Sequence, residues 1–255
     1  MKIEVLGCSG GIGGQHLRTT SLLVDQDVLI DAGTGVADLT LAELATIDHV
    51  FLTHSHLDHI ASLPLLIDSV SDLRQKPLHV HGLAATLEAI AKHIFNWVIW
   101  PDFTRIPTTE RPLMVYCPLT IGQCIELGER KFTALPAEHT VPAVGYQLDS
   151  GEGSLVFTGD TTVNNRFWPI VNKIDNLRCL LIETAFPDRE QRLAEISKHL
   201  CPSMLVEQLS RLNRPIEVYV SHLKPGLIEL TMAEIDARFA DNRPRMLKHR
   251  QTFIV

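Results

Sequence analysis

The feature that most restricts the fold of this chain is a run of metal-binding side chains in the segment Thr53–His59. Three histidines and one aspartate fall within six consecutive residues. Imidazole nitrogens and carboxylate oxygens are the ligands that a borderline metal ion such as zinc prefers. Residues 49–52 are typical of a short buried strand, and residues 60–70 carry apolar side chains at helical spacing. We therefore expect the polar run in a strand-to-helix turn.

The spacing within this turn favours two metal ions. His54 and His56 are two residues apart and can share one face, whereas Asp58 and His59 follow one turn later and can reach a second point. One ion seldom takes four ligands from six residues, but two ions about 3.5–4 Å apart can share them. The alternative is an exposed histidine-rich turn without a fixed ion, which the strand and helix around it disfavour.

Length and composition indicate one ordinary globular domain. The 255 residues show neither a linker nor a repeat, so we predict a single domain over residues 1–255. The formal net charge of -7 disfavours a long nucleic acid as partner. It leaves a small anionic substrate open, because two divalent ions would invert the local charge.

Cysteine usage and hydropathy predict a cytoplasmic protein. The five cysteines are an odd number without a Cys-x-x-Cys pair, which argues against a disulfide framework and a structural zinc site. The chain opens directly on a strand pattern without a charged and apolar leader. No run of about 18 apolar residues occurs, so no membrane span is expected.

The glycine-rich loop Gly7–Gly14 is similar to sequence motifs of two other enzyme classes. Its first five residues match G-x-S-x-G, the nucleophile elbow of α/β hydrolases, but only one strand precedes it. It also resembles the nucleotide-binding turn of short-chain dehydrogenases. Those enzymes share a Tyr-x-x-x-Lys pair that is absent here. We expect instead a tight loop with positive φ angles near the site.

The remaining candidate ligands each follow a predicted strand. His139, Asp160 and His222 come directly after strand patterns, where loops can converge at one edge. A workable division gives His54, His56 and His139 to one ion and Asp58, His59 and His222 to the other, with Asp160 between them. Asp31 ends an earlier strand before a glycine turn; it is either a turn former or a carboxylate that orients the histidine turn.

The order of elements predicts an α/β fold. Residues 1–31 contain three strand patterns without a helix between them, which predicts antiparallel pairing. From residue 113 strand patterns again dominate, and helical patterns follow both groups of strands. Two such halves predict a four-layer αββα sandwich.

These residues resemble the metallo-β-lactamase superfamily. Its His-x-His-x-Asp-His motif is matched at residues 54–59, its later His, Asp and His at His139, Asp160 and His222, and its early aspartate at Asp31. The resemblance implies a two-metal hydrolase with the αββα fold. Members of the superfamily hydrolyse lactams, thioesters or phosphodiesters.

A narrower resemblance is to the class II 3′,5′-cyclic-nucleotide phosphodiesterases of that superfamily. It rests on residues 54–63, 158–161, 182–186 and 221–225, and on Phe95-Asn96 with Trp100-Pro101. It implies hydrolysis of cAMP or cGMP, a small anionic phosphodiester substrate and two divalent ions. Zinc suits the ligands, and manganese or iron are also possible. A homodimer is a further expectation from the superfamily.

The expected chemistry gives several residues a role. Two metal ions lower the pKa of a bridging water from 15.7 toward about 7 for zinc, and the hydroxide attacks phosphorus. Asp58 and Asp160 would act in catalysis as ligands that hold this water. Lys224 would bind the substrate and neutralise charge on the phosphoryl oxygens, or is merely solvated. Glu183 is expected to orient the metal ligands without binding a metal ion itself.

Residues 94–112 read as an aromatic insertion. The segment holds two Trp, two Phe and two Pro within fourteen residues, which suits no regular helix. It either packs on the core or forms a lid, in which case Trp100 and Phe103 would bind a nucleobase. The histidines at 79, 81 and 93 lie outside the predicted site, and we expect them to be structural.

Three competing functions remain open from the sequence. A ribonuclease Z-like RNA phosphodiesterase shares the ligands but usually has a histidine at the place of Glu183 and a flexible arm, which is not visible here. A thioester or lactam hydrolase of the same superfamily is the second. A non-enzymatic metal-binding protein that keeps the fold is the third.

Overall fold

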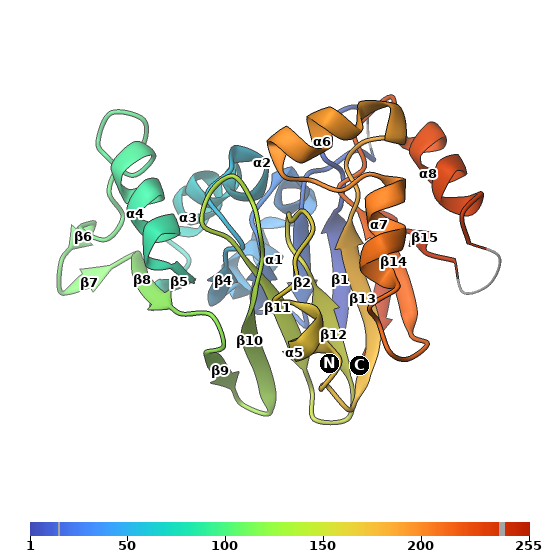
Figure 1. Cartoon of the computed structure of the whole chain (residues 1–255). Helices are drawn as coiled ribbons and strands as arrows, with labels where there is room; N and C mark the ends of the chain where they lie inside the picture. Colours follow the sequence, from blue (N-terminus) through green and yellow to red (C-terminus); the bar gives the residue numbers. More distant parts are fainter. Residues whose placement is uncertain (15, 240–242) are drawn as a thin grey trace.

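Two β-sheets face each other and carry helices on their outer sides (Figure 1). The computed structural model describes residues 1–14, 16–239 and 243–255. Three apolar cores separate the layers, one between the sheets and one under the helices on each outer side. The predicted α/β class and four-layer αββα sandwich are confirmed.

The first sheet contains the histidine turn. Its strands lie in the order β16-β1-β2-β3-β4-β5-β8. They are β1 (Lys2–Gly7), β2 (Ser21–Val24), β3 (Val28–Ile30), β4 (His49–Phe51), β5 (Leu78–Leu83), β8 (Met114–Leu119) and β16 (Thr252–Ile254). β1, β2 and β3 pair antiparallel, as predicted, whereas β3, β4, β5 and β8 run parallel.

The second sheet repeats this plan. Its order is β15-β14-β13-β12-β11-β10-β9, antiparallel from β9 to β12 and parallel from β12 to β15. The strands are β9 (Cys124–Leu127), β10 (Arg130–Pro136), β11 (Val144–Asp149), β12 (Ser154–Phe157), β13 (Leu177–Glu183), β14 (Glu217–Ser221) and β15 (Arg245–Met246). β15 is only two residues long, and the sequence pattern did not predict it. The carboxyl ends of the parallel strands of both sheets point to one edge of the sandwich, where loops can supply ligands.

Helices on the first sheet bury one apolar face each. They are α1 (Leu41–Thr46), α2 (Leu57–Ile60), α3 (Leu63–Val70) and α4 (Ala84–His93), preceded by the 3₁₀ turn η1 (Thr34–Asp38). α1 starts with a capping box, because Thr40 accepts from the backbone of Glu43 while the Glu43 carboxylate accepts from Thr40. α3 directs Leu63, Leu66 and Ile67 into the core.

Helices on the second sheet come from the later part of the chain. They are α5 (Trp168–Val171), α6 (Gln191–Ser197), α7 (Pro202–Leu209) and α8 (Ile228–Asp236), with a 3₁₀ turn, η2 (Asp188–Glu190), before α6. α7 begins with Pro202, whose fixed φ suits a first helical position. Among the described residues, no helix has the length and apolar character needed to cross a bilayer.

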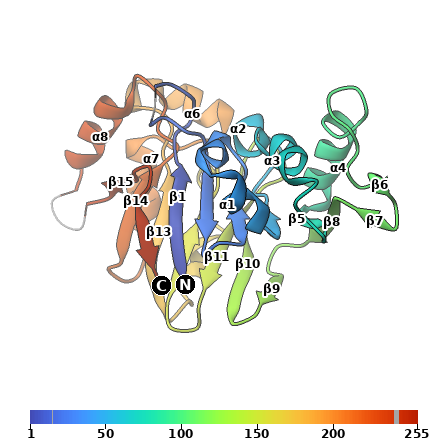
Figure 2. The ribbon, with the colours of Figure 1, turned by 180° about the vertical axis from the view of Figure 1, so that it is seen from behind.

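Both ends of the described chain meet at the opposite edge from the site (Figure 2). The amino group of Met1 donates to the carbonyl of Val255 at 2.7 Å, and β16 pairs with β1. The segment after α4 extends beyond the first sheet and contains a small hairpin, β6 (Pro107–Thr108) and β7 (Arg111–Pro112). That a single domain spans residues 1–255, with an insertion at 94–112, stays a prediction.

Candidate metal centre

The histidine turn is held by the buried carboxylate of Asp31. The backbone nitrogen and hydroxyl of Thr53 donate to its two oxygens at 2.7 and 2.8 Å, and Nδ1 of His59 donates to Oδ2 at 2.7 Å. Asp31 lies at the end of β3 with a φ of 58°, a left-handed conformation that is uncommon outside glycine. The aspartate therefore fixes both the backbone of the turn and the orientation of the His59 ring.

The turn places its ligands at two neighbouring points. His54 follows β4, His56 caps α2, and Asp58 and His59 lie in the first turn of α2. His56 Nδ1 lies 3.1 Å from Nε2 of His139, which follows β10 in the other sheet. His54, His56 and His139 thus form one group whose ligand atoms lie within 4.8 Å of one another.

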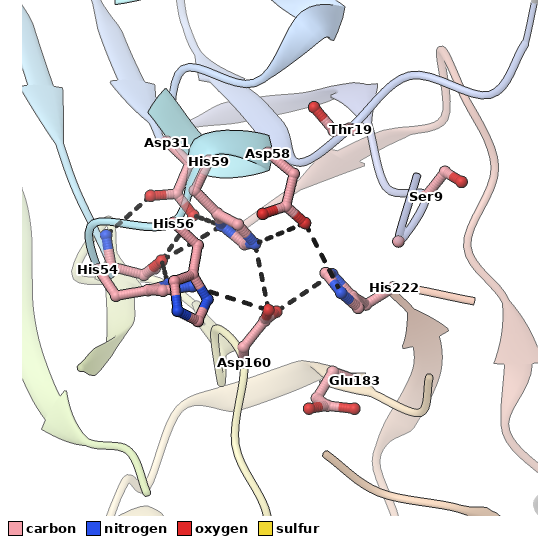
Figure 3. Close-up of polar contacts among 12 residues, drawn as sticks. Ser9, Thr19, Asp31, His54, His56, Asp58, His59, Asp160, Glu183 and His222 are labelled. Carbon is pink, nitrogen blue, oxygen red and sulfur yellow. Dashed lines mark hydrogen bonds and ion pairs between the residues drawn. The ribbon is translucent and has the colours of Figure 1, made fainter. Parts of the chain in front are cut away.

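The second group shares the same small space. His222 follows β14, and its Nδ1 lies 3.2 Å from Oδ1 of Asp160, while His59 Nε2 lies 3.3 Å from Oδ2 of Asp160 (Figure 3). The ligand atoms of Asp58, His59, Asp160 and His222 also lie within 4.8 Å of one another. Nε2 of His54, from the first group, is 3.8 Å from Oδ2 of Asp160. Asp160 therefore lies between the two groups.

Three buried ring nitrogens show that these residues fit metal ions. Nε2 of His54, Nε2 of His59 and Nδ1 of His222 have no hydrogen-bond partner within the described part of the chain, and all three approach Asp160. Buried polar atoms without partners are costly unless a ligand satisfies them. Neutral imidazole and carboxylate suit divalent ions of borderline softness.

Burial and neighbouring charges set the protonation of the site. Burial holds the pKa of His54 and of His222 well below the usual histidine value, and lowers the pKa of His139 to about 4. Burial alone would raise the pKa of Asp160, but the nearby His222 and His59 rings outweigh it and keep that pKa well below normal. Burial also lowers the pKa of His59, but Asp160 and Asp31 outweigh it and hold that pKa well above normal, so a metal ion must displace a proton from this ring. The rings of His54, His139 and His222 are free of protons at neutral pH and can bind a metal ion directly.

Glycines next to the site allow a close approach of backbones. A side chain at Gly10 would place its Cβ 2.4 Å from the carbonyl oxygen of His222. A side chain at Gly7 would lie 2.0 Å from the carbonyl oxygen of Thr19. In the loop Gly7–Gly14 only Gly14 has a positive φ, so the expectation of a loop built from positive φ angles is wrong. Gly7 and Gly10 therefore allow close backbone contact, whereas Gly14 supplies a positive φ.

Lys224 and Glu183 lie beside the ligands. The ammonium group of Lys224 donates to the carbonyl of Gly10 at 2.8 Å and lies 3.3 Å from Nε2 of His222. Glu183, fully buried at the end of β13, accepts a hydrogen bond from the backbone of Thr161 at 3.0 Å. Because Thr161 follows Asp160, Glu183 helps to place that aspartate.

One residue of this site, His199, was not predicted from the sequence. Its Nδ1 donates to Glu183 at 2.7 Å, and its ring lies 5.0 Å from the rings of both His139 and His222. It follows α6 directly after Lys198, which has a φ of 54°. No strand end or motif precedes it, so only the path of the chain after α6 brings it to the site.

The aromatic segment packs on the core, which is one of the two arrangements that the sequence left open. Phe103 is 3% exposed and, like Phe95, is buried in the core between the first sheet and its helices; Trp100 packs half-buried against the same core. Phe103 thus has no free face for a nucleobase, and Trp100 contributes to packing. The substrate-binding role predicted for Phe103 does not agree with its burial, because this side chain fills the outer core. The role predicted for half-buried Trp100 stays a prediction.

Comparison with known proteins agrees with this geometry. Residues 26–223 match the family model described as the β-lactamase superfamily domain. The chain belongs to the metallo-β-lactamase superfamily. As expected from the sequence, it is a metal-dependent hydrolase of this superfamily.

One curated relative and two solved structures illustrate the similarity. A protein of Aliivibrio fischeri named 3′,5′-cyclic-nucleotide phosphodiesterase is 27% identical over 272 residues, which cover 87% of this chain and 81% of the relative. The metallo-β-lactamase fold protein YhfI from Bacillus subtilis superposes with a TM-score of 0.78 at 19% identity, covering 99% of this chain and 98% of YhfI. Unliganded yeast PDE1 superposes with a TM-score of 0.78 at 18% identity, and the match covers 100% of this chain and 99% of PDE1. At these identities the two structures establish the fold.

Proposed function

We propose that this protein hydrolyses 3′,5′-cyclic nucleotides with two divalent metal ions. The observation that carries the proposal is the position of Asp160 between two ligand groups with unpartnered, buried ring nitrogens. The name of the relative from Aliivibrio fischeri, which aligns over most of both chains, supports a phosphodiester as substrate. Cyclic AMP or cyclic GMP is the small anionic substrate that we expect.

Each ligand has a place in this proposal. His54, His56 and His139 would hold one ion, Asp58, His59 and His222 the other, and Asp160 would contact both. When bound, such ions supply a nucleophile from water at neutral pH and neutralise negative charge on the phosphoryl oxygens. Zinc suits the donor set, and manganese or iron are alternatives.

The side chains around the ligands would act on the substrate. Lys224, whose ammonium group lies beside His222, would donate to a phosphoryl oxygen and so stabilise the charge that grows in the transition state. Asp31 and Glu183 would hold His59, the turn and the Asp160 loop in position. Addition of water across one P–O bond opens the cyclic ester to a nucleoside monophosphate, and the departing ribose oxygen takes up a proton.

A comparison of two substrates tests the proposed specificity. The purified, metal-loaded protein is assayed with 3′,5′-cAMP and with bis-p-nitrophenyl phosphate, and Asp160→Ala serves as control. We expect cAMP turnover well above that of the chromogenic diester, with both activities lost in the variant. Activity on the chromogenic diester alone would refute the cyclic-nucleotide assignment, leave a phosphodiesterase, and direct the search to RNA ends.

A further inference from the structure

A second group of imidazoles lies outside the metal centre, on β4 and β5. We name it the β4–β5 histidine cluster; it consists of His49, His79 and His81. The two strands are parallel neighbours, and in their register His49 lies beside His79 while Phe51 lies beside His81. Side chains two residues apart on a strand share a face, so all three rings lie on the face of the first sheet that meets the second sheet.

This cluster lies at the margin of the core between the sheets. The ring of His81 stacks on Phe51 with a centroid separation of 4.2 Å, and Phe51 stacks in turn on Phe132 of β10. His81 is 6% exposed, whereas His49 and His79 are half-buried. The cluster is therefore fixed on its inner side and reachable from solvent on its outer side.

One pair of nitrogens in the cluster has nearly the spacing of two ligands of one ion. Nδ1 of His49 and Nε2 of His81 are 3.0 Å apart. Two nitrogens that bind a tetrahedral zinc ion at about 2.0–2.1 Å lie about 3.3 Å from each other. The ring of His79 lies 5.0 Å from His49 and 6.5 Å from His81, so it must turn to join them.

His79 has an unpartnered nitrogen that a bound ion would satisfy. Its Nδ1 is buried without a hydrogen-bond partner in the described part of the chain. Burial lowers the pKa of His49, and lowers that of His81 to about 3, which keeps both rings neutral and able to coordinate. A purely structural cluster would leave the His79 nitrogen unsatisfied, at a cost in stability.

A fourth donor stands next to the histidines. Cys117 on β8 lies in register with His81 on β5, and registered residues of parallel strands share a face. Its thiol is free and only partly buried. Three imidazoles and a thiolate form a donor set that zinc accepts.

We propose that His49, His79 and His81 bind one divalent transition-metal ion, such as zinc, with Cys117 as its fourth ligand. This site shares no ligand with the catalytic centre, because its histidines lie on β4 and β5 and the histidine turn begins after β4 ends. An ion there would tie β4, β5 and β8 together just before the chain enters that turn. The inference does not depend on the proposed substrate.

Zinc content tests the proposal directly. The full-length protein, His79→Asn and His81→Asn are loaded with zinc, freed of excess by gel filtration and analysed for zinc per chain. His93→Asn is the matched control, because His93 is exposed at the end of α4. We expect three zinc ions in the native protein and the control, and two in both cluster variants, with diesterase activity retained.

Two outcomes would overturn the site. One is a native protein that binds no more zinc than His79→Asn; the other is a third zinc ion that persists in His79→Asn and His81→Asn. Circular dichroism confirms folding, and if buried His81 tolerates no asparagine, the half-buried position 79 decides. Cobalt loading should give a thiolate charge-transfer band that Cys117→Ser removes; absence of the band in the native protein would overturn the assignment of Cys117.

Discussion

The carboxylate of Asp31 lies 2.7 Å from Nδ1 of His59, and both side chains are fully buried. The hydrogen bond turns Nε2 of His59 toward Asp160. The same carboxylate also accepts both donors of Thr53. One residue directly after β3 thus orients a candidate metal ligand and holds the turn that carries three others.

Replacement of this carboxylate should weaken metal binding. In Asp31→Asn the amide keeps the shape but loses the charge that orients the His59 ring. We expect the affinity for zinc to fall about 10–100-fold, as for other residues that support metal ligands. Competition with a coloured chelator measures it, and Asp68→Asn, an exposed carboxylate on α3, is the control. An unchanged affinity in Asp31→Asn would contradict the orienting role.

Loss of the central ligand should have a larger effect on catalysis. Asp160→Asn removes the charge that lies between the two groups. We expect kcat for the chromogenic diester to fall by about 10³-fold or more, since this exceeds the effect of a single stabilising hydrogen bond. Steady-state kinetics on metal-loaded protein measures the fall. A variant with nearly native kcat would remove Asp160 from the centre.

His199 should matter for turnover more than for metal content. Its Nδ1 is committed to Glu183, and its ring stands beside His139 and His222. A side chain that donates a proton to a leaving oxygen contributes about 10²–10⁴-fold to a rate. We therefore expect His199→Asn to lower kcat by about 10²-fold, with zinc per chain unchanged. Loss of one zinc ion in this variant would instead make His199 a ligand.

Substitution of a buried side chain in the aromatic segment should change the stability of the protein and not its substrate binding. Phe103→Ala removes a buried ring from the outer core and should cost about 3–5 kcal/mol of unfolding free energy. Trp97→Ala, at a site that is 58% exposed, should change stability little. Urea denaturation measures both, and KM for cAMP should stay native in each. A selective rise in KM for Phe103→Ala would restore its predicted contact with the base.

An ion pair between the sheets should make the folding stability depend on pH in the acidic range. Arg130 on β10 donates to both oxygens of Asp27 at 2.6 and 2.8 Å, and this hydrogen bonding lowers the pKa of Asp27. Because the folded pKa is the lower one, the unfolded chain binds more protons below about pH 4. The stabilisation is thus complete above that pH and is lost as the pH falls through the folded pKa.

The Asp27→Asn variant measures this contribution. The Asp27 side chain is 34% exposed, so solvent screens the pair and we expect a loss on the order of 0.5–1 kcal/mol at neutral pH. The difference from the native protein in urea denaturation should shrink as the pH falls below about 4, the unfolded pKa of an aspartate. A difference that grows in acid would contradict the assigned sign.

Whether a site residue could be predicted from the sequence depends on the kind of element that precedes it. His54, Asp160 and His222 follow strands, and strand ends are visible in the hydropathy pattern and converge at one edge. His199 follows a helix, and its place depends on how the chain returns to the sheet. Aromatic composition alone did not separate a lid from a core; the structure buries Phe103 in the core, and substrate contact by Trp100 stays a prediction.

Very short elements could not be predicted from the sequence pattern either. The two-residue strand β15 is defined by its pairing with β14, not by its own residues. The histidines of β5 were expected to be structural, and their shared face with His49 became visible only through the register of β4 and β5. The homodimer, the cytoplasmic location and the absence of a nucleic-acid partner stay predictions.

Anomalous X-ray diffraction at the zinc edge, on crystals of the zinc-loaded protein, tests the central claim most directly. We predict two anomalous peaks within the cluster that Asp160 joins, one near His54, His56 and His139 and the other near Asp58, His59 and His222. A single peak, or none, in this cluster at full zinc loading would contradict the two-metal centre.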